Sequence, residues 1–171
     1  QWHGDPKSVA VEYLKRTITK ALEAEKLGHT VRFIGMGDYT DFASPSNRAR
    51  LKAANLYDTA SDVIDQKALD LMDEVYDFLR PTRGKWLGLV EGHHFHELKD
   101  GTTTDMRLCE KLDGAFLGTT GLLHVQFERQ TSSQCIGFVL WVHHGTGNGQ
   151  TGYYPLNRLE KIAAAWEQVD I

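Results

Sequence analysis

Three short clusters of acidic and histidine side chains stand out along the chain, each directly after an apolar run. They are Gly37-Asp38, Gly92-His93-His94 and His143-His144-Gly145. In open α/β sheets, ligands bind outside the carboxyl ends of the strands, so clusters that are distant in sequence can meet there. Imidazole and carboxylate together suit zinc, iron, manganese or nickel better than calcium. The pattern therefore predicts a metal site.

Each cluster also has an ordinary structural interpretation when it is taken alone. An Asp after a Gly, such as Asp38, is often a turn or cap residue. His93 and His94 could be solvated loop histidines. Side chains alternate along a strand, so one of His143 and His144 should point away from any site. The metal interpretation rests on the three clusters occurring together, because three independent coincidences are less probable than one.

The elements that must position these clusters follow from hydrophobic spacing and from turn residues. Apolar residues at helical spacing predict helices, and β-prone runs predict strands. Helices alternating with strands indicate an α/β fold. Helices are expected from Ser8 to Gly28, over 44–57, 59–79 and 102–112, and from Pro155 onward, and strands over 30–36, 86–90, 121–129 and 135–142.

Composition limits the function classes. The chain has 171 residues, 41% of them hydrophobic, and a formal net charge of -4. These values predict one globular domain over 1–171, with no global attraction to nucleic acid or to an anionic membrane. No apolar run is long enough to span a bilayer. Cys109 and Cys135 are far apart and form no CxxC motif, which favours reduced thiols in a cytoplasmic protein.

The order of the clusters resembles the calcineurin-like metallophosphoesterases, and in particular bacteriophage or prophage members. The family signature runs Asp-x-His, Gly-Asp-x-x-Asp/Glu, Gly-Asn-His-Asp/Glu, a strand-end His and then Gly-His-x-His. The second block is matched by "GMGDYTD", which contains Asp38 and Asp41. The third is matched by "VEGHHFHE", with His93 in place of Asn and Phe95 in place of the acid. The fourth is matched by "VLWVHHGTG", which contains His144.

The resemblance implies a four-layer α-β-β-α sandwich that is incomplete at both ends of this chain. The first Asp would precede Gln1, and the Gly-His-x-His block would follow Ile171. Either Gln1 or His3 could be the remaining ligand of the first block, and the spacing to Gly4 does not decide between them. A truncated fragment of this kind would expose a sheet edge and would aggregate or bind a partner.

The implied function is hydrolysis of a phosphodiester or another phosphate ester by a metal-bridging hydroxide, with nucleic acids and nucleotides among the candidate substrates. Two divalent ions (manganese, zinc, iron or nickel) would be the cofactors. Asp38 would bridge them, and His93 and His144 would bind one of them. His94 would be the catalytic acid, oriented by Asp41 or Glu97. The substrate would contact Tyr39, Asp41, Phe95 and His143.

Three further points remain open in the sequence. The basic residues Arg48, Arg50, Lys52, Arg80, Arg83 and Lys85 could hold a nucleic-acid backbone, but solvated surface charges are the favoured interpretation. Tyr39, Phe42 and Phe95 could stack on a base or pack the rim of the site. A catalytically degenerate or truncated binding or scaffold module is the alternative function, and a structural domain with a single metal site is a third.

Overall fold

The structure is a computed structural model, and it describes residues 9–54, 56–129 and 131–145. It shows a mixed α/β fold with four α-helices, one short 3-10 helix and two small sheets among these residues. The α/β prediction is therefore confirmed. The candidate ligands Gln1 and His3 and the helix expected from Pro155 lie outside the described residues.

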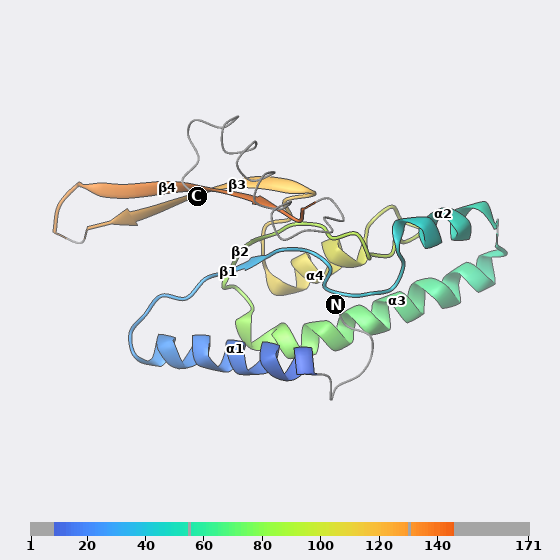
Figure 1. Ribbon diagram of the computed structural model, residues 1–171, viewed down its shortest axis with the longest axis horizontal. Helices are drawn as coiled ribbons and strands as arrows, with labels where there is room; N and C mark the ends of the chain where they lie inside the picture. The colour runs from blue at the N-terminus through green and yellow to red at the C-terminus, as the bar shows by residue number, and fades with distance from the viewer. Residues whose placement is uncertain (1–8, 55, 130, 146–171) are drawn as a thin grey trace, which may run out of the picture.

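The two long helices, α1 (Val9–Lys26) and α3 (Asp58–Leu79), form one layer of the fold (Figure 1). Their apolar residues recur at helical spacing, as predicted from the sequence. Val11 and Ile18 are buried on α1, and α3 buries Ala68, Met72, Val75 and Leu79. The buried stripe does not extend to the start of α3, where Ala60 is exposed. Helix α3 ends in the 3-10 turn η1 (Arg80–Thr82), where Pro81 interrupts helical bonding.

The two short helices begin at side-chain caps. Helix α2 (Pro45–Ala53) starts after Ser44, whose hydroxyl accepts a hydrogen bond from the Asn47 backbone N–H at 3.3 Å. It ends four residues earlier than predicted. Helix α4 (Thr104–Leu112) starts after Thr103, which caps the Met106 N–H, and ends at Asp113 with a φ of 59°.

Strands β1 (Phe33–Gly35) and β2 (Trp86–Leu89) are parallel neighbours, with Gly35 opposite Leu89. β1 is shorter than the predicted run of 30–36, because ladder bonds are made only where β2 lies alongside. On the other side of β2, Leu89 exchanges backbone hydrogen bonds with Ala115 and Leu117. Because β1 and β2 are parallel, their carboxyl ends lie at one edge, which carries Asp38 and His93.

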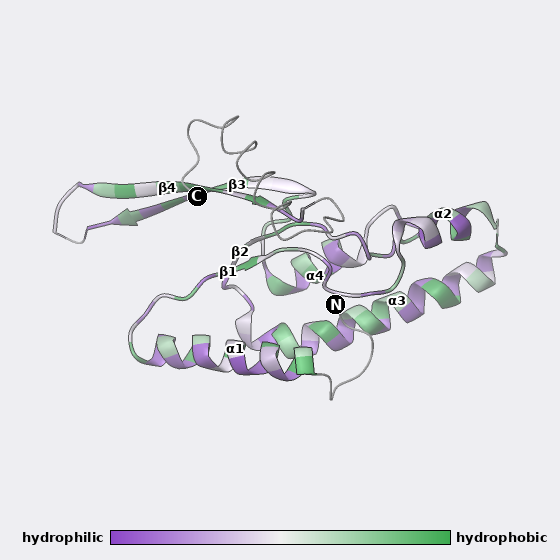
Figure 2. Cartoon of the chain, in the orientation of Figure 1, coloured by the Kyte–Doolittle hydropathy of each residue, from purple (hydrophilic) through white to green (hydrophobic). Residues whose placement is uncertain are grey.

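Strands β3 (Thr120–Glu128) and β4 (Cys135–His143) form an antiparallel hairpin within one residue of the predicted strand ends. In Figure 1, the β1–β2 pair lies between this hairpin and the layer of α1 and α3. The hydropathy colours in Figure 2 show that apolar residues occupy one stripe of each long helix. The main core cluster joins α1 and α3 to β2 and α4. It consists of Val11, Ile18, Met72, Val75, Leu79, Leu89, Leu108, Cys109 and Leu112.

None of the helices in the described ranges combines the length and the apolar character needed to cross a membrane.

Candidate metal centre

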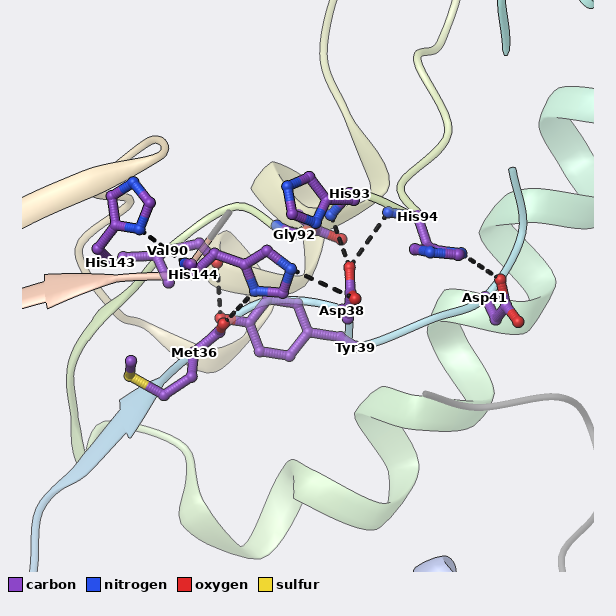
Figure 3. Close-up of polar contacts among 12 residues, drawn as sticks. Met36, Asp38, Tyr39, Asp41, Val90, Gly92, His93, His94, His143 and His144 are labelled. Carbon is purple, nitrogen blue, oxygen red and sulfur yellow. Dashed lines mark hydrogen bonds and ion pairs between the residues drawn. The ribbon is translucent and has the colours of Figure 1, made fainter. Parts of the chain in front are cut away.

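Asp38 lies just beyond the end of β1, in a turn that brings its backbone close to the β2 edge. Its φ is 52° and that of Gly37 is 89°, so both residues adopt left-handed conformations. Asp tolerates this region better than most residues because of its short polar side chain. Its Oδ1 accepts hydrogen bonds from the backbone N–H groups of His93 at 2.6 Å and His94 at 3.2 Å (Figure 3). These two bonds join the β1 turn to the segment that follows β2.

The approach of these two segments requires a glycine at position 92. A Cβ atom there would overlap the backbone nitrogen, the Cα and the Oδ1 of Asp38. A Cβ atom at Gly37 would likewise overlap the imidazole Nδ1 of His144. The glycines of "GMGD" and "EGHH" therefore permit the close backbone approach on which the site depends.

His144, the residue directly after β4, completes the cluster. Its Nδ1 lies 2.6 Å from the carbonyl oxygen of Met36, and its Nε2 lies 3.3 Å from Oδ2 of Asp38 (Figure 3). A carbonyl only accepts, so Nδ1 carries the hydrogen and donates it. The lone pair of the neutral ring is then on Nε2, which faces the carboxylate. A backbone bond that fixes the tautomer in this way is typical of metal-binding histidines.

His93 contributes the third possible ligand. Its ring lies 4.4 Å from that of His144, measured between centroids, and at 65° to it. One ligand atom from each of Asp38, His93 and His144 lies within 4.8 Å of the others. The donor set is one carboxylate and two imidazoles, which suits zinc, manganese, iron or nickel. The residues present therefore fit a divalent transition metal.

His94 points away from the carboxylate of Asp38 and toward Asp41 (Figure 3). Its Nδ1 lies 2.5 Å from Asp41 Oδ1, and both side chains are a little more than one quarter exposed. Glu97, the other residue considered for orienting His94, instead pairs with Lys52 at 2.7 Å. When Nδ1–H donates to Asp41, the Nε2 of His94 is the nitrogen that can exchange a proton with a substrate.

Tyr39, Phe95 and His143 were expected to contact a substrate, but their side chains have other contacts. The Tyr39 hydroxyl donates to the Val90 carbonyl oxygen at 2.9 Å, and its ring packs on the core. Burial is the main cause of the raised pKa of this phenol. The ring of Phe95 lies 3.8 Å below the guanidinium of Arg48.

The His143 ring points away from Asp38, as alternation along a strand requires (Figure 3). It stacks on Trp141 with a centroid distance of 5.2 Å, and its Nδ1 accepts from the Gly145 N–H at 2.7 Å. The structure therefore brings Asp38, His93 and His144 together, with the His94–Asp41 pair beside them.

Two residues near the site make contacts that the sequence did not indicate. Asp105, in the first turn of α4, is 1% exposed, and its Oδ2 accepts from the Gly92 N–H at 2.9 Å. The pKa of Asp105 is raised to about 6, mainly by burial and in addition by the nearby carboxylates of Glu91 and Asp38, while the Gly92 hydrogen bond lowers it. Arg48 on α2 donates to the carbonyls of His93 and Phe95. Acidic residues are common in the first turn of a helix, where they interact favourably with the helix dipole. The sequence pattern therefore did not distinguish Asp105 from an ordinary residue of this kind.

Comparison with protein-family models, with curated proteins and with solved structures gives no match for this chain.

Three of the six basic residues considered for nucleic-acid binding form ion pairs within the protein. Lys85 pairs with Glu25 at 2.8 Å, and Lys52 pairs with Glu97. Arg80 lies 3.9 Å from Asp77. These pairs agree with the favoured interpretation that such charges belong to the surface and to local structure.

Proposed function

We propose that this protein is a metal-dependent phosphoesterase that hydrolyses a phosphodiester. One observation carries the proposal: Asp38, His93 and His144 offer ligand atoms within 4.8 Å of one another, directly beside the His94–Asp41 pair. Hydrolysis of a phosphate ester requires a metal ion that activates water and a group that transfers a proton. The ligand cluster and the carboxylate-oriented histidine could supply these two functions.

In this proposal, Asp38, His93 and His144 hold a divalent ion, with manganese, zinc, iron or nickel as candidates. The bound ion would supply an acidified water and neutralise charge on the phosphate oxygens. A second ion would need ligands in addition to these three. Gln1 or His3, which the family resemblance assigns to such a role, lie outside the described residues.

His94 is the proposed general acid. Asp41 holds its Nδ1–H, which orients the ring and stabilises the charged imidazolium. A proton on Nε2 can then pass to the leaving oxygen as its bond to phosphorus breaks. The pair is partly exposed, so a substrate can reach it from solvent.

The fold that accompanies this proposal is a four-layer α-β-β-α sandwich. Helices α1 and α3 lie on one side of β1–β2, and the hairpin lies on the other side (Figure 1). The strand register places apolar residues on one face of the hairpin, as the two inner sheets of a sandwich require. They are Leu123, Val125, Phe127, Ile136, Phe138, Leu140 and Val142.

A cytoplasmic location is also part of this proposal. Cys109 and Cys135 are both free thiols. Reduced cysteines are usual in a reducing compartment.

The test combines metal analysis with a hydrolysis assay. The purified chain is loaded with Mn²⁺ or Zn²⁺, metal content is measured by mass spectrometry, and bis-p-nitrophenyl phosphate is offered as substrate. Asp38→Asn and His144→Ala should both lose metal and activity. His29→Ala is the matched control, because His29 is an exposed histidine in the loop after α1.

The outcomes separate the candidate functions. Metal and hydrolysis that are lost together in both site variants support the enzyme. Stoichiometric metal without hydrolysis would point to the structural metal domain. A folded chain that binds neither Mn²⁺ nor Zn²⁺ would overturn the proposal and favour a binding or scaffold module.

A further inference from the structure

The segment Gly92–Phe95 carries both a proposed metal ligand and the proposed general acid, yet it belongs to no helix or strand. Its backbone is held by other parts of the chain. The His94 carbonyl accepts from the N–H groups of Phe42 and Ala43, both at 3.2 Å. The N–H groups of His93 and His94 donate to Oδ1 of Asp38, as described above. Two charged side chains on different helices make further contacts with the segment.

On the α4 side, the buried carboxylate of Asp105 accepts the Gly92 N–H at 2.9 Å. Helix α4 is fixed in the core through Leu108, Cys109 and Leu112, so this carboxylate has a rigid support. Asp105 thus holds the peptide group between Glu91 and Gly92, one residue before His93. A hydrogen bond from a backbone N–H to a buried carboxylate is stronger and more directional than one to a neutral group.

On the α2 side, Arg48 donates from a single nitrogen, Nη1, to three carbonyl oxygens. These belong to Ala43 at 2.7 Å, His93 at 2.6 Å and Phe95 at 3.0 Å. Its guanidinium also lies 3.8 Å above the Phe95 ring. Arg48 therefore holds the carbonyl groups of the residues before and after His94. Its planar group suits both the stacking and the convergent bonds.

We propose that Asp105 and Arg48 are positioning residues that hold segment 92–95 from opposite ends, so that His93 reaches the metal while His94 stays on Asp41. This inference rests on the proposed function, and it assigns roles to two residues outside the ligand cluster and the proposed acid. An irregular loop samples many backbone conformations unless its peptide groups are bonded. Partners that orient metal ligands typically change metal affinity roughly 10–100-fold when they are removed.

The experiment measures Co²⁺ binding to the full 171-residue chain by visible absorption, which reports the number and type of ligands around the ion. Arg48→Ala and Asp105→Ala should each weaken Co²⁺ affinity roughly 10–100-fold, with the stoichiometry unchanged. Asp105→Asn should restore most of the affinity, because its amide oxygen can still accept from Gly92. Arg48→Lys should be intermediate, since lysine is a point charge without the planar fork.

The matched controls are Arg50→Ala, an exposed arginine on the same helix as Arg48, and Glu110→Ala, an exposed acid on the same helix as Asp105. Both should bind Co²⁺ within about twofold of the unsubstituted chain, since neither touches the segment. Circular dichroism checks folding. If an alanine variant unfolds, the comparison rests on Arg48→Lys and Asp105→Asn.

A second readout in metal-free protein keeps this inference separate from the proposed function. The imidazole ring-proton NMR resonances of His93 and His94 should shift in Arg48→Ala and Asp105→Ala but not in the controls. A chain that binds no Co²⁺ yet shows these shifts would overturn the phosphoesterase proposal and support the positioning of the segment. Unchanged Co²⁺ affinity together with unchanged resonances would overturn the positioning roles.

Discussion

The Nε2 of His144 lies 3.3 Å from Oδ2 of Asp38, although the two residues follow strands of different sheets. Because the Nδ1 hydrogen of His144 is donated to the Met36 carbonyl, the neutral ring presents a lone pair to the carboxylate. Two electron-pair donors at this distance are satisfied by a proton or a cation between them. His93 beside them favours the cation, since it adds a further nitrogen ligand.

Divalent metal should stabilise the fold through this pair. At a free Mn²⁺ concentration of about 100 times its Kd, the free energy of unfolding should rise by roughly 2.7 kcal/mol, because metal binds the folded chain alone. The measurement is thermal unfolding with Mn²⁺ and with EDTA. Asp38→Asn should show no such difference. An equal rise in Asp38→Asn would place the metal elsewhere.

Replacement of the proposed acid should separate chemistry from metal binding. His94→Ala should lower kcat by roughly 10²–10⁴-fold while the metal content is unchanged, since Nδ1 of His94 is bonded to Asp41. Asp41→Asn should lower kcat by less, because the imidazole remains. Steady-state assays with bis-p-nitrophenyl phosphate and metal analysis check this. If metal is lost with His94, then His94 is a ligand and not the acid.

A methyl group at Gly92 should damage the site directly. Gly92→Ala would force the Asp38 backbone and carboxylate away, at a cost of roughly 1–3 kcal/mol and with loss of metal. Gly28→Ala is the control: its φ is 92° and nothing lies within 4 Å of the added atom. It should cost about 1–2 kcal/mol from backbone strain alone and keep the metal. If Gly92→Ala still bound metal, the close contact between Gly92 and Asp38 would not be required for the metal site.

Asp105 should make stability depend on pH in the mildly acidic range. Burial raises its pKa to about 6 in the folded chain, from about 3.8 when unfolded, so the folded state holds its proton over a wider range. The stabilisation of the folded state by protonated Asp105 is therefore complete below pH 3.8 and is lost as pH rises through 6. The free energy of unfolding falls by roughly 3 kcal/mol at most over this range.

Urea unfolding of the metal-free chain and of Asp105→Asn at pH 4.5 and pH 7 measures this contribution. The asparagine variant should gain stability relative to the unsubstituted chain between the two pH values. A difference that is the same at both pH values would show that Asp105 does not titrate in this window.

Substitution by alanine should lower the free energy of unfolding much more at a core position than at an exposed hairpin position. Leu108 is 0% exposed, and Leu108→Ala should cost roughly 2–5 kcal/mol of unfolding free energy. Ile136, near the hairpin tip, is 73% exposed, and Ile136→Ala should change stability by less than about 0.5 kcal/mol. Both are read from urea midpoints. A large cost at Ile136 would mean that the apolar hairpin face is covered.

Much of the secondary structure was predictable because it follows from local spacing. The apolar period of α3 and the alternating strands of the hairpin were both anticipated closely. Strand β1 was overpredicted, since a β-prone run forms a ladder only where a neighbouring strand is present. The clusters at Asp38, His93 and His144 were also identified, because metal-binding side chains at strand ends are recognisable from residue type alone.

The sequence by itself determined which side chains can bind a metal and where the glycines stand that let their segments approach. The tertiary structure decided which candidates meet. In the folded chain His144 lies against Asp38, whereas the His143 ring points away from it. Asp41 pairs with His94, and Glu97 pairs with Lys52 instead. The Tyr39 hydroxyl donates to a backbone carbonyl. The tertiary structure also placed Arg48 and Asp105 on the segment around His93. These contacts join residues far apart in the chain, so they depend on how the elements pack and leave no trace in local spacing.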